Sequence, residues 1–86
     1  MPIITVKYLV NLREKAGTGR EELDFSENAR LQDVAERIRK LHGIDLHDPR
    51  IMATLNGKGW SQYPEGINTR VKEADVVLLF PPLSGG

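Results

Sequence analysis

Apolar and polar residues alternate over the first part of the chain. The apolar positions of this alternation are Ile4, Val6, Tyr8, Val10 and Leu12. A period of two residues is typical of a strand that buries one face, so we expect a strand over residues 4–12. Residues 13–19 are polar and contain two glycines, which predicts a turn or a helical loop. Alternation returns in residues 21–25, and we expect this strand to pair back on the first with Leu23 and Phe25 facing inward.

The period of the pattern changes to that of a helix after Ala29. Apolar residues recur at Leu31, Val34, Ala35, Ile38 and Leu41, while charged residues occupy the other face. This spacing predicts one amphipathic helix. We expect Ser26 or Asn28 to cap its first turn, and Gly43 to take the left-handed conformation that ends it.

The loop after this helix is rich in side chains that can bind metals. His42, Asp45, His47 and Asp48 lie close together in the sequence. Their spacing matches no established ligand motif, and turns commonly contain Asp. We therefore expect a polar surface loop and no metal site.

The second half of the chain predicts a hairpin followed by an irregular segment. Residues 50–55 have the pattern of a strand, and Asn56-Gly57 is a strong hairpin signal because both residues tolerate positive φ. The hairpin leads into residues 58–60. Trp60 and Tyr63 lie beside a predicted turn, and we expect both to pack on the edge of the core rather than to serve in recognition.

The apolar run at residues 76–80 predicts the last strand. It is unbroken, which is typical of a central strand covered on both faces. The order of elements is then strand, strand, helix, strand, short strand and strand. We predict an α+β domain over residues 1–80 with the β-grasp, or ubiquitin-like, fold, in which one main helix packs across a mixed sheet of four to five strands.

The sequence given ends in Pro81-Pro82-Leu83-Ser84-Gly85-Gly86. The two prolines lack a backbone donor, so the chain must leave the sheet there. Six extended residues reach about 20 Å, far enough to carry a terminus into another protein's pocket. Glycine has no Cβ, which lets the walls of such a pocket close around the backbone. We expect residues 81–86 to form a flexible tail that presents the Gly86 carboxylate as a substrate handle.

Composition narrows the classes of function. Lys plus Arg and Asp plus Glu both count 12, and this balance argues against nucleic acid as the main partner. The chain has no cysteine, which excludes disulfides and a thiol nucleophile. A charged leader and a stretch of membrane-spanning length are both missing, so we expect a cytoplasmic protein that does not bind membranes. We find no catalytic motif that predicts an independent active site.

The chain resembles the MoaD/ThiS-like sulfur carrier family along its whole length, most closely its molybdopterin synthase small-subunit branch. The residues that carry the resemblance are Leu12-Arg13-Glu14, Asn56-Gly57 and the ending Phe80-Pro81-Pro82-Leu83-Ser84-Gly85-Gly86. The ending is the most specific of these. Two departures are Ala74-Asp75, where the family usually has Gly-Asp, and a longer segment over residues 59–72.

The resemblance implies a mechanism at the chain end. An E1-like adenylyltransferase would use ATP to adenylate the Gly86 carboxylate, and a sulfur donor such as a cysteine desulfurase system would convert it to a thiocarboxylate. The large catalytic subunit of molybdopterin synthase, in a heterotetramer, would receive the tail and its sulfur for molybdenum cofactor biosynthesis. Gly85 would let the tail pass through narrow channels. Phe80 would anchor the tail, and the residues that guide it would be Pro81, Pro82, Leu83 and Ser84. The chain itself would bind no cofactor and act as a sulfur-donating cosubstrate.

Three alternatives stay open at this point. A ubiquitin-like modifier would use the same activation but join Gly86 to lysines of target proteins. A carrier for the thiamin, cysteine or transfer-RNA thiolation pathways would share the tail chemistry and deliver sulfur elsewhere. An inert β-grasp interaction module would make the two terminal glycines incidental.

Overall fold

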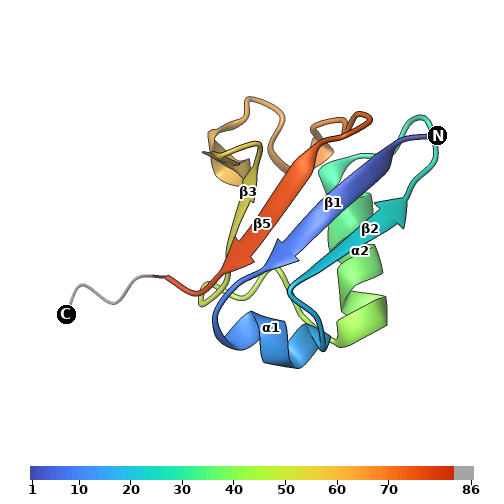
Figure 1. Cartoon of the computed structure of the whole chain (residues 1–86). Coiled ribbons are helices and arrows are strands. Elements are labelled where there is room, and N and C mark those ends of the chain that lie inside the picture. The colour runs from blue at the N-terminus through green and yellow to red at the C-terminus, as the bar shows by residue number, and fades with distance from the viewer. Residues whose placement is uncertain (83–86) are drawn as a thin grey trace.

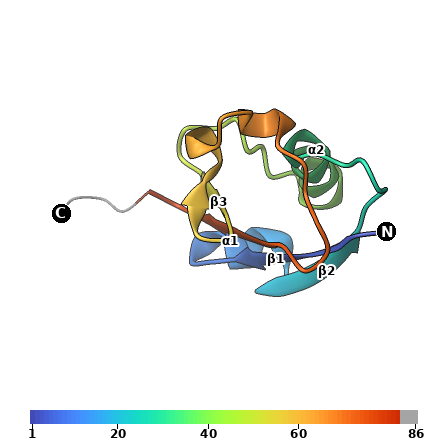
Figure 2. The same ribbon diagram turned by 90° about the horizontal axis from the view of Figure 1, so that it is seen from above.

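The computed structural model describes residues 1–82 of the chain. One layer is a five-stranded sheet, and the second contains the long helix together with two short 3₁₀ turns (Figures 1 and 2). The elements are β1 (Ile3–Tyr8), α1 (Asn11–Ala16), β2 (Arg20–Asp24), α2 (Leu31–His42), β3 (Met52–Leu55), β4 (Lys58–Gly59), η1 (Trp60–Gln62), η2 (Gly66–Asn68) and β5 (Val76–Phe80). The predicted β-grasp fold is confirmed.

Strand β5 lies in the middle of the sheet, whose order is β2-β1-β5-β3-β4. It runs parallel to β1, with Tyr8 opposite Leu79, and antiparallel to β3. Two parallel neighbours need a long crossover connection, and α2 lies in the connection between them. The predicted central position of the last strand is therefore confirmed.

The core lies between the sheet and α2. Its fully buried side chains include Ile4, Val6 and Tyr8 from β1, Val77 and Leu79 from β5, and Leu31, Val34 and Ile38 from α2. Leu23 and Phe25 are buried as predicted. Each large apolar side chain taken out of water contributes about 1.5–3 kcal/mol, so this layer supplies most of the favourable free energy of folding.

The opposite face of β5 corrects one prediction. The unbroken apolar run predicted cover on both faces, but Val76, Leu78 and Phe80 are only half-buried. They alternate with the buried Val77 and Leu79, so they point away from α2. Within residues 1–82 the long helix covers one face of the sheet, which leaves this apolar strip partly open (Figure 2).

The first strand is shorter than predicted. β1 ends at Tyr8, because its partner β2 begins only at Arg20, which pairs with Lys7. The chain turns at Val10, where the Leu12 amide donates to the Leu9 carbonyl at 3.2 Å, and continues into α1. Leu12 is buried from this helix, whereas Val10 is 72% exposed. The strand assignment of Val10 was wrong.

Both ends of α2 were only partly predicted. Gly43 has φ of 71° and ends the helix as expected. The N-cap is Arg30 rather than Ser26 or Asn28. The Arg30 amide donates to the Asp33 carboxylate at 2.8 Å, and the Leu31 amide donates to the Thr69 carbonyl at 2.9 Å, so one local and one tertiary bond satisfy the start of the helix. Leu41 is 51% exposed, contrary to prediction. His42 instead follows Ile38 by one helical turn and occupies the inward position.

The hairpin and the segment after it follow the prediction closely. Asn56 and Gly57 have φ of 52° and 87°. Trp60 is buried, and the Tyr63 hydroxyl donates to the Leu55 carbonyl at 2.6 Å. Both aromatic residues therefore pack on the body of the domain.

A buried carboxylate joins this hairpin to the start of β5. Asp75 is 9% exposed and accepts hydrogen bonds from the Asn56 side-chain amide at 3.0 Å and the Lys72 backbone amide at 2.7 Å. The Asn56 side-chain oxygen in turn accepts from the Val76 amide at 2.9 Å. These bonds fix the entry of the chain into β5.

We expect Asp75→Ala to lower the free energy of unfolding by about 2 kcal/mol, because it leaves the Asn56 and Lys72 donors without an acceptor. Urea denaturation measures this change. The control Asp24→Ala removes an exposed carboxylate from β2 and should change stability by less than about 0.5 kcal/mol. Equal effects of the two variants would contradict the role given to Asp75.

Ala74 has φ of 72°, in the left-handed region that favours glycine. This conformation costs a residue with a Cβ roughly 1–2 kcal/mol. We expect Ala74→Gly to raise the free energy of unfolding by about 1 kcal/mol in thermal or urea denaturation. Ala35→Gly, in the middle of α2, should lower it by about 1 kcal/mol. A loss of stability in both variants would show that Ala74 is not strained.

Candidate functional site

The candidate site is the root of the tail, where the chain leaves the sheet. β5 ends at Phe80, Pro81 is half-buried and Pro82 is exposed. The chain leaves at the end of the sheet opposite to the start of β1 (Figure 1). Proline lacks the N–H that a further ladder bond would need, so the strand stops where the sequence predicted.

The four residues that carry the rest of the predicted site lie outside the described part of the chain. These are Leu83, Ser84, Gly85 and Gly86. The threading role of Gly85, the guiding roles of Leu83 and Ser84 and the reacting role of Gly86 therefore stay predictions, as does the division of the chain into domain and tail.

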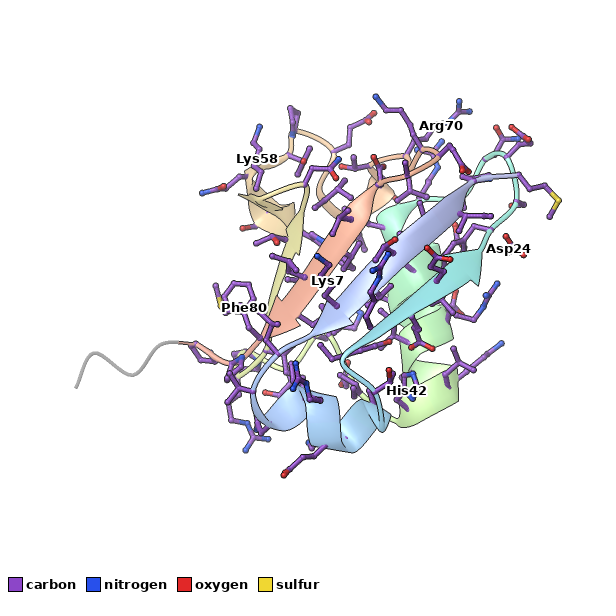
Figure 3. All side chains as sticks on the ribbon, viewed as in Figure 1. Lys7, Asp24, His42, Lys58, Arg70 and Phe80 are labelled. Carbon is purple, nitrogen blue, oxygen red and sulfur yellow. The ribbon has the colours of Figure 1, made fainter. Side chains whose placement is uncertain are left out.

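Apolar side chains from three segments surround the tail root. Phe80 pairs with Met52, which is 44% exposed. On the other side of β5, the Leu9 amide donates to the Leu79 carbonyl at 2.9 Å, which places the exposed Val10 beside the end of the strand. Lys7 and Phe80 lie on the face of the sheet turned away from α2 (Figure 3). We call Val10, Met52 and Phe80 the tail-root surface.

Of the residues in this surface, only Phe80 was predicted from the sequence. Val10 continues the alternation of apolar and polar residues, so the pattern predicts a strand there although the residue lies in a turn. Met52 is one of six residues in a predicted strand, and nothing in the local pattern separates it from its neighbours. The pairing of β3 with β5 brings it to the tail root.

A second notable feature is a polar cluster at the C-terminal end of α2. The Tyr8 hydroxyl donates to Glu21 Oε2 at 2.5 Å, and His42 Nε2 lies 2.5 Å from the same oxygen. The Tyr8 and His42 rings meet edge to face, with centroids 5.3 Å apart. The three residues come from β1, β2 and α2, and His42 is labelled in Figure 3. The cluster joins the sheet to the helix.

This cluster has an electrostatic consequence for its tyrosine. Tyr8 is fully buried, and the His42 and Glu21 side chains are 14% and 22% exposed. Burial, reinforced by the hydrogen bond to Glu21, raises the pKa of Tyr8 well above its ordinary value. The phenol therefore stays protonated and acts as a donor that holds the carboxylate in place.

The metal-capable side chains of the loop after α2 have other roles. Asp45 and Asp48 accept hydrogen bonds from the backbone amides of His47 and Arg50, each at 2.9 Å, and so shape the loop. Across residues 1–82, three or more His, Cys, Asp or Glu side chains never come together in a group that could hold a metal ion. No helix in this part of the chain is long and apolar enough to cross a membrane.

Comparison with known families decides the class of protein. The model of the ThiS family matches residues 6–86, which include the tail root and the predicted tail. The chain belongs to the ThiS family. A comparison with curated protein sequences gives no significant match.

Solved structures of similar proteins share the fold over nearly the whole chain. A Pyrococcus furiosus protein provisionally described as molybdopterin converting factor, subunit 1, is 29% identical, with a TM-score of 0.81 over 96% of this chain and 100% of that one. Small archaeal modifier protein 1 from Methanosarcina acetivorans is 27% identical, with a TM-score of 0.78 over 100% and 98%. A chain of the BexX/CysO complex from Amycolatopsis orientalis has the same fold at 19% identity, with a TM-score of 0.69 over 96% and 99%.

The raised pKa of Tyr8 predicts how stability changes at high pH. The unfolded chain loses the phenolic proton near pH 10, whereas the folded chain keeps it. The contribution of the protonated Tyr8 phenol to the free energy of unfolding is therefore fully present below pH 10. Above pH 10 the free energy of unfolding falls by about 1.4 kcal/mol per pH unit. We expect Tyr8→Phe to be less stable at neutral pH but to show a smaller loss between pH 10 and 11, measured by urea denaturation. Equal slopes in the two proteins would contradict the prediction.

Proposed function

We propose that this chain is a sulfur carrier of the molybdopterin type, the small subunit of a molybdopterin synthase. An E1-like adenylyltransferase uses ATP to convert the Gly86 carboxylate to an acyl adenylate. A sulfur donor then displaces AMP and leaves a thiocarboxylate. The large catalytic subunit of the synthase receives the tail and takes its sulfur for molybdenum cofactor biosynthesis. The chain acts as a cosubstrate, and the activating partner is the one that binds ATP.

Membership of the ThiS family carries this proposal. The family match extends through residue 86, so it includes the two terminal glycines. The similarity to the Pyrococcus furiosus protein described as molybdopterin converting factor, subunit 1, favours the molybdopterin branch. The tail root adds physical support, because β5 holds it at the edge of the domain and an exposed Pro82 leads away from the sheet.

A protein modifier is the second candidate function. The similarity to small archaeal modifier protein 1 from Methanosarcina acetivorans, at 27% identity, is nearly as high and favours this alternative. Adenylation of Gly86 is common to both functions. They differ in the nucleophile that takes the activated glycine, which is a sulfur donor in one case and a lysine amine of a target protein in the other.

The intact mass of the purified chain tests the proposal. We expect incubation with ATP, the activating enzyme and a sulfur source to replace one oxygen by sulfur, confined to the peptide that contains Gly86. Deletion of Gly86 should abolish the change, because the reacting carboxylate is then misplaced. The control Ile3→Thr changes an exposed residue at the start of β1, at the end of the sheet opposite to the tail root, and should leave the sulfur transfer unchanged.

Two other results would overturn the proposal. Conjugates of the whole chain with other proteins, without a thiocarboxylate, would favour the modifier. No change at all, with an activating enzyme that is active on its known substrate, would favour an inert module. If the thiocarboxylate forms, transfer of its sulfur to the pterin precursor by the large subunit distinguishes the molybdopterin pathway from the thiamin, cysteine and transfer-RNA pathways.

A further inference from the structure

Val10 has an unusual backbone conformation. Its φ is 57° and its ψ is −128°, at the first central position of the turn that links β1 to α1. Glycine favours this position, and a β-branched residue at positive φ is a genuine outlier. Residues held in this way often serve a function that offsets their strain.

Packing within the domain does not explain why a valine occupies this position. It is 72% exposed, so it buries little apolar surface in the domain. The backbone hydrogen bonds of the turn, from the Leu12 and Arg13 amides to the Leu9 and Val10 carbonyls, are also available to glycine. The strain therefore has no packing benefit within the domain, and the exposed side chain is available for contact with another molecule.

Met52 presents a second exposed apolar side chain at the same end of the domain. Val10 and Met52 lie on opposite sides of the end of β5. Val10 follows Leu9, which is bonded to Leu79, and Met52 pairs with Phe80 on the β3 side. Their chain neighbours Asn11 and Ile51 line one surface hollow, which confirms that the two segments lie side by side. Val10 and Met52 therefore form the two outer sides of the tail-root surface.

The length of the chain beyond this surface identifies its occupant. Residues 81–86 reach at most about 20 Å from Phe80. An enzyme that encloses Gly86 in its active site takes up the last residues of this segment, so its own surface comes against the tail root. Activation of Gly86 is the step that the carrier and modifier functions share, and the activating enzyme is thus the partner that both require.

We propose that Val10 and Met52 are contact residues for the activating enzyme, which covers them with an apolar surface while it holds Gly86 for adenylation. The inference rests on the proposed function, since it requires that Gly86 is adenylated. Val10 is a specificity-determining residue in this account, because its branched side chain projects from a turn that would be more stable with glycine.

The test is ATP–pyrophosphate exchange by the activating enzyme of the same organism, measured at increasing concentrations of the chain. Val10→Thr keeps the branched shape and Met52→Gln keeps the length, and each makes the side chain polar. We expect each to raise KM about fivefold and to leave kcat unchanged. The matched control Ile3→Thr changes another exposed apolar residue, at the far end of β1, and should leave both constants unchanged.

Val10→Gly separates the contact from stability. We expect it to raise Tm by roughly 4 °C, because it relieves the strain, and still to raise KM about fivefold. A KM unchanged in the Val10 and Met52 variants, or raised equally by Ile3→Thr, would overturn this inference alone. An absence of exchange with the unaltered chain, with an enzyme active on its known substrate, would overturn the proposed function and this inference together.

Discussion

The parallel pairing of β5 with β1 is the constraint on which the rest of the structure depends. The paired residues Tyr8 and Leu79 are both fully buried against α2. β3 pairs with the other edge of β5, so the strand has hydrogen-bonded neighbours on both sides. The end of β5 therefore cannot shift without breaking two ladders, and the position of the tail root is set by the core of the domain.

The same pairing explains where backbone strain occurs. The Ala74 amide donates to the Ile3 carbonyl at 3.0 Å, and the Leu9 amide donates to the Leu79 carbonyl at 2.9 Å. Ala74 and Val10 thus lie just outside opposite ends of the β1–β5 ladder, and both have positive φ. The chain must turn sharply at each end to enter or leave the pair. Strain of about 1–2 kcal/mol at each position is large against a typical stability of 5–15 kcal/mol.

The domain over residues 1–80 and the proposed reacting group at Gly86 have different roles. The polar groups in the body hold elements together, as the Tyr8 hydroxyl and Asp75 do. The proposed reacting group belongs to Gly86, at the end of a segment whose only bulky side chain beyond the two prolines is that of Leu83. The body then contributes position and recognition.

The sequence alone determined the class of fold, the long helix, the Asn56-Gly57 turn and the central last strand, because these depend on local periodicity and backbone preference. It also pointed to the ending that the family match includes. Only the tertiary structure decided where β1 stops, which face of β5 is open, and that Glu21 meets His42 across 21 residues. Val10 and Met52 likewise came to the tail root through strand pairing. Such contacts join distant parts of the chain, and a local pattern of apolar and polar residues carries no information about them.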